Sequence, residues 1–221
     1  MFGLVKFFNK CEAAGIKPIS GSSIRVAFDE DDQSHELLCL AKTNQGHKNL
    51  MKIISSAHNN YNFQTPIIDF ASLTELKEDI VVISGGKDSH IFNLLKRNKT
   101  EDAEKRVDQF LKAFDDDFVL EVQRTNRLDE NEYFANLLPL SSKKGIPVIA
   151  TNDVLFSKEE DFDIHETKVC INTGKTLNDP NREKLFSKEQ YFKSSAEMED
   201  LFDGFDELIS NTIEISKKCN V

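Results

Sequence analysis

Residues 84–89, with the sequence SGGKDS, have the types and the order needed to bind a phosphate group. They follow an apolar run at residues 80–83 and precede a helix-like run at residues 91–96. A glycine-rich loop between a strand and a helix can hold pyrophosphate with its backbone amides at the helix amino terminus. An ATP-using enzyme with a pyrophosphate loop is therefore one hypothesis for this chain.

Residues 161–166, with the sequence DFDIHE, resemble a cluster of metal ligands at first sight. Consecutive residues on a helix point in different directions, however, and cannot converge on one ion. We interpret this segment as a solvated helix face with His165 packed against its neighbours. The remaining histidines without a carboxylate or cysteine at ligand spacing, which we expect on the surface or on a helix face, are His47, His58 and His90.

Sequence patterns typical of helices and of strands alternate along the chain, and the elements that they predict must position residues 84–89 and the histidines. Apolar runs indicate strands at residues 16–19, 24–28, 37–41, 79–83, 118–122 and 147–150. Apolar residues at helical spacing indicate helices at residues 4–11, 49–58, 103–114 and 130–143. The acidic run 29–32 is expected at the tip of a hairpin, and the last third is mainly helical apart from an irregular stretch at 174–181. The alternation predicts an α/β fold with a mostly parallel sheet and helices outside it.

The composition narrows the class of protein. Lys and Arg number 28 against 38 Asp and Glu, so the net charge is −10. A chain whose main task is to wrap DNA needs a basic surface for phosphate contacts, and this balance argues against that class. Four widely spaced cysteines without a CxxC pair indicate reduced thiols and a cytoplasmic protein. No apolar run approaches a membrane span, and no linker or repeat divides the chain, so we expect one domain over residues 1–221.

Short segments in one order along almost the whole chain resemble a single protein family. They are MFG at 1–3, AGIKPI at 14–19, LAK at 40–42 with Gly46, KNLM at 48–51, PIID at 66–69, SGG at 84–86, LEVQR at 120–124, TND at 151–153, GKTLNDP at 174–180 and NTIEI at 211–215. Together they resemble the amino-terminal PHP (polymerase and histidinol phosphatase) domain of the alpha subunit of bacterial replicative DNA polymerase III. The resemblance implies a distorted, TIM-like β/α barrel with a metal site in the loops at the carboxyl ends of its strands.

The same resemblance implies that the barrel is incomplete at its amino terminus. The family begins with a strand bearing a His-x-His pair, then a helix and a second strand, which end just before the position of Met1. We therefore expect an N-terminally truncated PHP domain whose strand edges and apolar interior faces are left exposed. Helices at about 187–221 are expected to lead toward a polymerase core that this chain lacks.

Metal-binding members of the family carry ligands at strand ends, and the resemblance assigns those positions to residues of this chain. The positions are Ser23, Glu36, Gly86, Thr125, Asp153 and Leu155. Only Asp153 matches the family ligand, and His35 lies one residue too early, which in a strand turns a side chain to the opposite face. Several converging ligands are needed for a multinuclear site, so we expect no bound metal, no catalytic residue and no cofactor in this region. The Asp153 carboxylate is expected to cap the next helix or to bond backbone amides.

These assignments imply a degenerate PHP domain without chemistry of its own. By the resemblance, the parent protein is a DNA-directed DNA polymerase, a nucleotidyltransferase that uses Mg²⁺ and contacts DNA through regions outside this chain. The domain is expected to support the polymerase III core and to bind the separate proofreading 3′–5′ exonuclease subunit. Two alternatives stay open, a metal-dependent phosphoesterase or exonuclease with other ligands, and the pyrophosphate-loop enzyme. The family places a Ser-Gly turn at residues 84–86, which favours a tight turn over a nucleotide site there.

Overall fold

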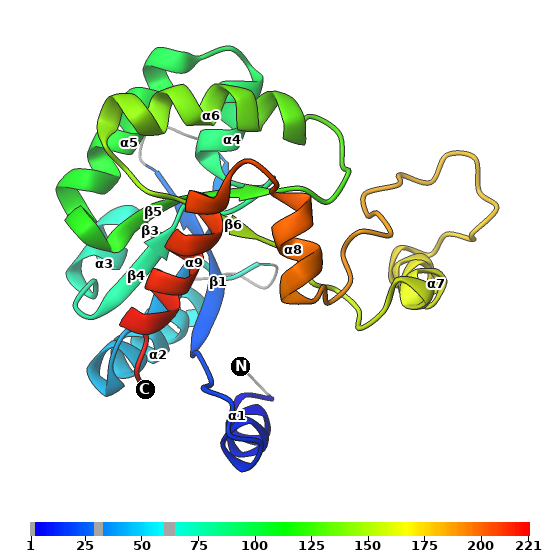
Figure 1. The fold of residues 1–221 in the computed structure, drawn as a ribbon, viewed down its shortest axis with the longest axis horizontal. Coiled ribbons are helices and arrows are strands. Elements are labelled where there is room, and N and C mark those ends of the chain that lie inside the picture. Colours follow the sequence, from blue (N-terminus) through cyan, green and yellow to red (C-terminus); the bar gives the residue numbers. More distant parts are fainter. Residues whose placement is uncertain (1–2, 29–32, 60–64) are drawn as a thin grey trace.

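The protein folds into an α/β structure around one six-stranded sheet (Figure 1). The computed structural model describes residues 3–28, 33–59 and 65–221, and the run 29–32, predicted as a hairpin tip, lies outside them. Across the sheet the strand order is β3-β1-β2-β4-β5-β6. The predicted fold class is confirmed, and a sheet that stays open within the described residues is consistent with an incomplete barrel.

Most of the predicted elements form within a few residues of their expected bounds. The strands are β1 (Gly21–Ala27), β2 (Ser34–Ala41), β3 (Ile67–Asp69), β4 (Ile80–Ile83), β5 (Phe118–Gln123) and β6 (Val148–Thr151). The helices are α1 (Leu4–Ala13), α2 (Asn44–Asn59), α3 (Phe70–Glu75), α4 (His90–Lys96), α5 (Thr100–Phe114), α6 (Glu130–Lys144), α7 (Phe162–Thr173), α8 (Ser195–Leu201) and α9 (Asp206–Lys218). Among the described residues, no helix combines the length and the apolar character that a membrane crossing requires.

One predicted strand is wrong. Residues 16–19 form no strand, and residues 21–23, expected to separate two strands, begin β1 instead. Pro18 has no N–H to donate to a strand ladder, and Ile16 is exposed, so this segment has neither the hydrogen bonds nor the burial that a central strand needs.

The strand directions bring several strand ends to one edge of the sheet. β4, β5 and β6 run parallel to one another, whereas β2 is antiparallel to both of its neighbours, β1 and β4. The start of β2 therefore lies beside the carboxyl ends of β4, β5 and β6. We call this region, around Glu36, Gly86, Gln123 and Thr151, the strand-end edge. It is where a barrel of this kind carries its functional side chains.

Helices α2 to α6 cover one face of the sheet and enclose the main core (Figure 1). Side chains alternate along β2, so that Leu37, Cys39 and Ala41 are buried against these helices. Aromatic rings fill the space between α5 and the sheet, where Phe110 stacks on Phe118 with ring centroids 4.6 Å apart. This packing fixes β4 and β5, and with them the strand-end edge.

Helix α9 packs on the opposite face of the sheet (Figure 1). Ile215 of α9 forms a second apolar cluster with the strand residues Val81, Ile83, Val119 and Ile149. The sequence predicts exposed interior faces for an incomplete barrel. The structure corrects this in part, because α9 buries this group of side chains.

Side chains of α9 also bind the outer edge of β6. Asn211 Nδ2 donates to the Val148 carbonyl oxygen at 2.9 Å. Thr212 Oγ1 accepts from the Ala150 N–H at 3.2 Å and lies 2.9 Å from the Ala150 carbonyl oxygen. An edge that we expected to be open thus has part of its backbone hydrogen bonding satisfied by a helix.

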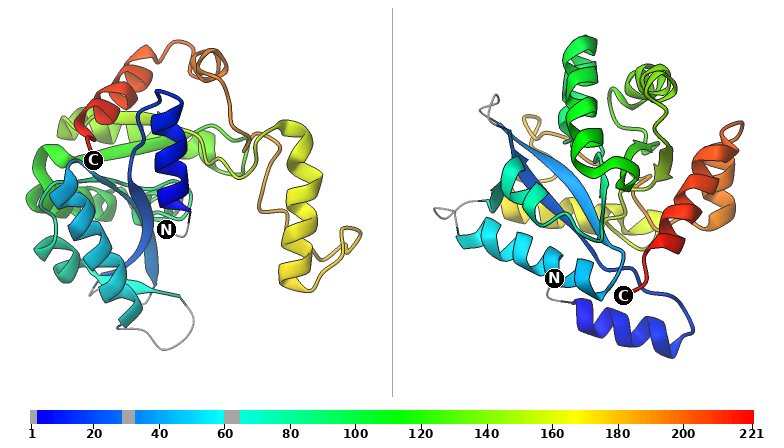
Figure 2. Two further views of the ribbon diagram at one scale, coloured as in Figure 1. Left: turned by 90° about the horizontal axis from the view of Figure 1, so that it is seen from below. Right: turned by 90° about the vertical axis from the view of Figure 1, so that its left-hand side faces the viewer.

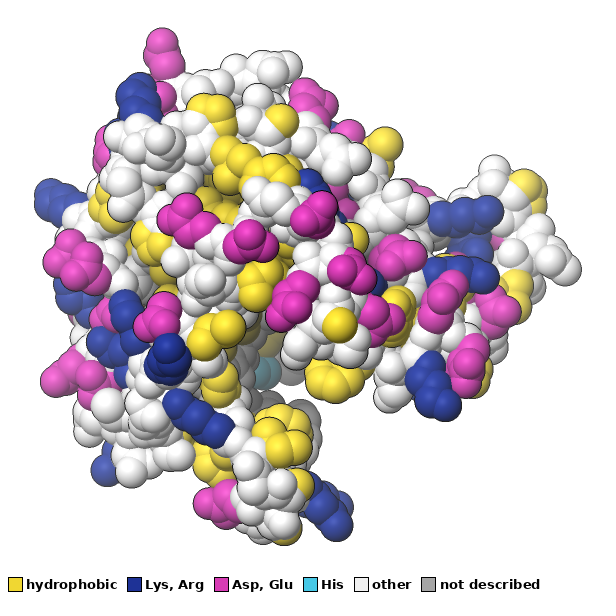
Figure 3. Space-filling view, in the orientation of Figure 1, with side chains coloured by type: hydrophobic (Ala, Val, Ile, Leu, Met, Phe, Trp, Pro, Cys, Tyr) yellow, Lys and Arg dark blue, Asp and Glu magenta, His cyan; other side chains and the backbone are white. Residues whose placement is uncertain are grey.

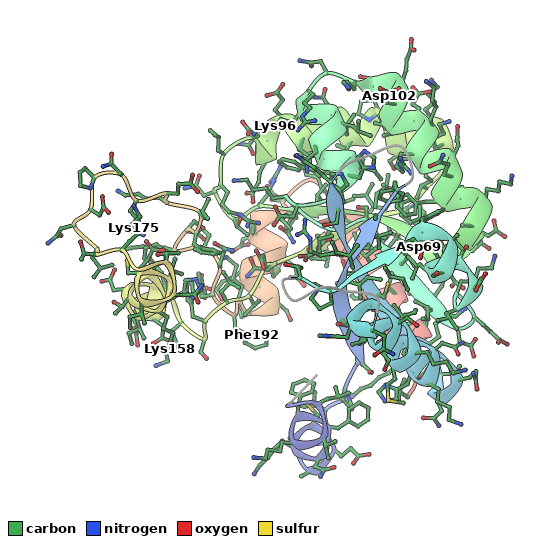
Figure 4. The ribbon with its side chains drawn as sticks, turned by 180° about the vertical axis from the view of Figure 1, so that it is seen from behind. Asp69, Lys96, Asp102, Lys158, Lys175 and Phe192 are labelled. Carbon is green, nitrogen blue, oxygen red and sulfur yellow. The ribbon has the colours of Figure 1, made fainter. Side chains whose placement is uncertain are left out.

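Two segments stand away from the body of the molecule, α1 and the region of α7 (Figure 2). No residue of α1 is buried, and hydrophobic side chains gather on its surface (Figure 3). After α7 the chain returns through residues 174–194 without helix or strand beyond one isolated bridge, so the predicted irregular stretch is confirmed and is longer than expected. Lys158 and Lys175 lie on this projection (Figure 4).

Buried contacts hold the α7 projection together. Glu166 and Arg182 form an ion pair in which both side chains are almost fully buried. His165 packs edge-on against Phe186, with ring centroids 4.8 Å apart, and lies near Phe156. The predicted packing of His165 is therefore confirmed, whereas Glu166 belongs to the interior and not to a solvated face.

Candidate functional site

Two of the predicted ligand positions, Ser23 and Glu36, meet at the strand-end edge. The Glu36 carboxylate is hydrogen-bonded to the Ser23 side chain and lies near the carboxylates of Asp88 and Asp153. Burial is the main cause that raises the pKa of the Glu36 carboxyl; the charges of Asp88 and Asp153 add to the rise, and the bond to Ser23 opposes it. Glu36 is thus an acidic group that the surroundings push toward its neutral form.

His35 lies on the other face of β2, as its position one residue before Glu36 predicts. Its ring stacks on His90 with centroids 4.2 Å apart, and Phe28 packs beside both rings. His90, which we expected on the surface or on a helix face, is buried at the start of α4. Neither histidine faces the strand-end edge, so His35 cannot substitute for a ligand at position 36.

Glu121 is a buried carboxylate at the strand-end edge that the sequence analysis missed. It accepts hydrogen bonds from the Thr151 hydroxyl and, at 3.0 Å, from Gln123 Nε2. Burial raises the pKa of the Glu121 carboxyl, with smaller contributions from Asp153 and Glu36. An acidic residue at the centre of the apolar strand FVLEVQ was the signal that could have identified it.

Arg127, also missed, places a positive charge at the same edge. The guanidinium donates from Nη2 to Gln123 Oε1 at 2.8 Å and from Nη1 to Asp153 Oδ2 at 3.1 Å. Its Nε donates to Thr125 Oγ1 at 2.8 Å and to Glu130 Oε1 at 3.1 Å. The Arg127 side chain is only 10% exposed. It therefore connects the end of β5, the start of α6 and the end of β6.

Three predicted positions provide no ligand atom to a shared centre. A Cβ on Gly86 would lie 2.4 Å from Gln123 Oε1, so the Gln123 amide fills the space that a side chain at position 86 would need. Thr125 is fully buried, and its N–H and hydroxyl donate to the Glu130 carboxylate. Leu155 is 39% exposed and contacts the rest of the chain through its backbone N–H, which donates to the Gln190 carbonyl at 2.8 Å.

The Asp153 carboxylate is bound by side chains, which corrects the prediction of a helix cap. Its Oδ2 accepts from Arg127 and, at 2.8 Å, from Gln190 Nε2. Gln190 is fully buried and belongs to the segment 187–191, which we call the strap. The strap is joined to β6 by a further bond, from Asn152 Nδ2 to the Tyr191 carbonyl at 2.6 Å. Asp153 thus holds the strap against the strand-end edge.

The residues at the strand-end edge do not fit a multinuclear metal cluster. Gly86 and Leu155 have no ligand atom in the side chain, and Thr125 is committed to Glu130. Asp153 Oδ2 is bound to the Arg127 guanidinium, whose positive charge repels a metal cation. Within the described ranges, no three His, Cys, Asp or Glu side chains lie close enough together to bind one ion.

The SGGKDS segment at residues 84–89 is a tight turn that bonds to its own surroundings. Ser84 Oγ accepts from the Glu121 N–H at 3.0 Å, and Ser89 caps α4 by accepting from the Phe92 N–H at 3.1 Å. Gly85 has a φ of +81°, and a Cβ there would lie 2.6 Å from the Glu36 carbonyl oxygen. The glycine is required by this close approach of two backbones, which explains the motif without a nucleotide.

An open α/β sheet with polar side chains gathered at the strand-end edge places the protein in the α/β class and is consistent with an incomplete barrel. Comparison with known families finds the PHP domain at residues 1–125. Because this match covers more than half of the chain, the chain belongs to the PHP domain family.

Relatives of the whole chain are bacterial proteins named DNA polymerase III subunit alpha. The protein of Vibrio cholerae serotype O1 is 40% identical over 221 aligned positions, and the match covers 99% of this chain. The Escherichia coli K12 protein is 41% identical over 222 residues, and the Pseudomonas aeruginosa protein is 39% identical over 223 residues. In all three comparisons the chain spans 19% of the relative's own length. The predicted resemblance is confirmed at this level.

Proposed function

We propose that this chain is the PHP region of a DNA polymerase III alpha subunit and that it acts in DNA replication as a non-catalytic, partner-binding domain. The likeness in sequence to alpha subunits along 99% of the chain supports the parent protein. The observation that carries the non-catalytic role is the contact of Arg127 with Asp153 at 3.1 Å. In this proposal, DNA synthesis, Mg²⁺ binding and DNA contact belong to other regions of the parent protein.

The physical reason for the lack of activity is the chemistry of the strand-end edge. A metal-dependent phosphoesterase needs cations that activate water and that neutralise the phosphate. Here Asp153, the one carboxylate that matches a family ligand, accepts hydrogen bonds from Arg127 and from Gln190 of the strap. Glu36 and Glu121 both lie near Asp153, whose charge adds to the rise in the pKa of each carboxyl, so this edge presents acidic groups to an entering phosphate where a phosphoesterase presents metal cations.

We further propose that residues 1–221 form one domain in the cytoplasm. The C-terminal helices at about 187–221 contribute Phe202 and Leu208 to the core that the sheet and helices α2 to α6 share. The strap adds polar contacts to β6. A domain built in this way gives the polymerase body a rigid support at one side.

The partner in this proposal is the proofreading 3′–5′ exonuclease subunit. Docking sites need exposed apolar anchors more than charge, and four exposed apolar side chains on α1 and α7 are Val5, Phe7, Ile164 and Ile171. The face in Figure 3 shows Lys and Arg side chains interspersed with acidic ones, which favours a protein partner over DNA. A docked exonuclease would have a raised effective concentration near the primer end.

The test combines metal content, nuclease activity and partner binding. Elemental analysis of the purified chain is expected to find less than one zinc, manganese or magnesium ion per chain. Single-stranded DNA should stay intact when manganese is added. Two or more metals per chain, together with manganese-dependent cleavage, would establish the alternative of a metal-dependent phosphoesterase.

Partner binding is measured by co-purification with the exonuclease subunit of the same organism. The wild-type chain is expected to retain it, and a pair of aspartate substitutions on α1 (Val5 and Phe7) or on α7 (Ile164 and Ile171) is expected to abolish retention. Leu128→Asp is the matched control, because Leu128 is 75% exposed and lies on neither helix. Loss of binding in the control alone, or in no variant, would contradict the proposed anchors.

A further inference from the structure

At the strand-end edge the Arg127 side chain contacts Asp153, which stands at a position that the family resemblance assigns to a metal ligand. The Arg127 side chain contacts two carboxylates, one of them Glu130, which is 6% exposed, and the other Asp153, which is 36% exposed. A buried carboxylate without a cation or hydrogen-bond donors strongly opposes folding. A positive charge at this place therefore stabilises the fold, in addition to the hydrogen bonds that Glu130 accepts from Thr125 and that Asp153 accepts from Gln190.

Arg127 also fixes the neutral groups around it. Gln123 accepts from Arg127 through Oε1 and donates through Nε2 to Glu121, so the guanidinium sets which way the amide points. In this orientation the Gln123 amide closes the space beside Gly86. Thr125 accepts from Arg127 and donates to Glu130, which completes a network among the first residues after β5.

The network reaches the strap at two points, the first of which is a carboxylate oxygen of Asp153. Asp153 Oδ2 accepts from both Arg127 and Gln190. A second contact comes from Ser187, whose hydroxyl donates to the Thr125 carbonyl oxygen. The guanidinium, with the groups that it orients, thus links three consecutive elements, β5, α6 and β6, to the strap, which is distant from them in sequence.

We propose that the Arg127 guanidinium is a fixed internal cation that replaces the metal ions of the site, so that the strand-end edge and the strap stay assembled without a metal. A guanidinium is planar, stays charged at all accessible pH values and can donate to several acceptors at once. These properties suit a centre that must join two carboxylates, an amide and a hydroxyl. The inference rests on the proposed function only in its premise that the native site holds no metal.

The test is the thermal stability of Arg127 variants of this chain. Arg127→Met is expected to lower Tm by roughly 10 °C, because removing one partner of a buried charge pair leaves the other uncompensated. Arg127→Lys keeps the charge without the planar fork and should lose less. Arg97→Met is the matched control, since Arg97 is exposed and its side chain forms no ion pair with any residue that the structure describes. A Tm for Arg127→Met within 1–2 °C of the control, roughly the shift of an ordinary surface change, would overturn the inference.

A double-mutant cycle separates charge compensation from packing. Glu130→Gln should cost less Tm in the Arg127→Met background than in the wild type, because the carboxylate left without its cation is then removed. Equal costs in both backgrounds would show that Arg127 acts by packing alone. This result would refute the inference even if Arg127→Met is unstable.

Hydrogen exchange gives a local readout that a general loss of stability would not produce. In Arg127→Met, the Leu155 and Phe192 amides, which bond to the Gln190 and Phe156 carbonyls, should exchange faster than amides between β1 and β2. Uniform acceleration across the sheet would contradict the role of Arg127 in holding the strap. Chelators should leave the wild-type Tm unchanged. A chelator that lowers it would overturn the proposed metal-free function, whereas the variants test the arginine.

Discussion

Replacing Phe202 tests whether the C-terminal helices belong to the same folding unit as the sheet. Phe202 follows the last residue of α8 as its C-cap, is fully buried and is part of the main core. The Arg124 guanidinium lies over its ring at 5.3 Å and over the Phe134 ring of α6 at 4.8 Å. Arg124 also donates to the Leu201 carbonyl at 2.7 Å. Phe202 is therefore the centre of the contact between α8 and the rest of the core.

The expected loss in Phe202→Ala follows from this burial. Truncation of a fully buried phenylalanine costs about 3–5 kcal/mol of unfolding free energy through lost transfer energy and the cavity left behind. Loss of the guanidinium–ring contact adds roughly 0.5 kcal/mol. For a domain of this size 1 kcal/mol corresponds to about 2–4 °C, so a fall in Tm of roughly 7–22 °C is expected.

The assay is differential scanning calorimetry, with urea unfolding followed by circular dichroism as a second measure. One transition that moves as a whole is expected, because α8 and the sheet share one core. The matched control is Phe192→Ala, since Phe192 is 74% exposed and lies at the outer side of its segment near α8 (Figure 4). A separate transition for the C-terminal helices, or equal shifts in the two variants, would refute the single-domain reasoning.

Three other perturbations have defined outcomes. Gly46→Ala should cost roughly 1–3 kcal/mol in urea unfolding, because the new Cβ would lie 2.0 Å from the Asp79 carbonyl oxygen and the backbones must separate; stability equal to wild type would contradict this. The hydrogen bonds from Ser194 lower the pKa of Glu197 to about 2, so Glu197→Gln should be less stable than wild type above pH 4.5, with the difference lost as the pH falls toward 2. Burial raises the pKa of Glu121, and its ionised form therefore opposes folding as the pH rises through that pKa. The Glu121→Gln variant should have a higher Tm than the wild type at pH 8 but not below pH 4.5. A gain in Tm that is independent of pH would contradict the assignment.

The fold was largely predictable because most of its elements have strong local patterns. β4 and β5 are apolar runs that are buried on both faces, and α5 has its apolar side chains on one side. The short strand β3 was missed, since it has only three residues, which pair with β1 and with no other strand of the described residues, and it has no pattern of its own. The wrong strand at 16–19 came from counting apolar residues without weighing Pro18.

The location of the candidate site could be predicted from the sequence, but the full set of side chains that meet there could not. The resemblance identified Glu36 and Asp153, which do lie near each other. It could not identify Arg127, because this side chain reaches the edge from a loop and its partners come from β5, α6 and β6. Convergence of this kind depends on tertiary structure, and the spacing of residues in the sequence does not encode it.

Helix α9 occupies the outer edge of β6, so another strand could pair with β6 only by displacing this helix. Asn211 and Thr212 provide only a few side-chain hydrogen bonds, each contributing about 1 kcal/mol. An incoming strand would offer a longer series of backbone bonds, but it would first have to displace α9 and expose Ile215 and the apolar cluster beneath it. Helix α9 thus disfavours edge-to-edge association of two chains through β6. A strand could still pair with β6 if its own contacts compensated for the exposure of the apolar cluster.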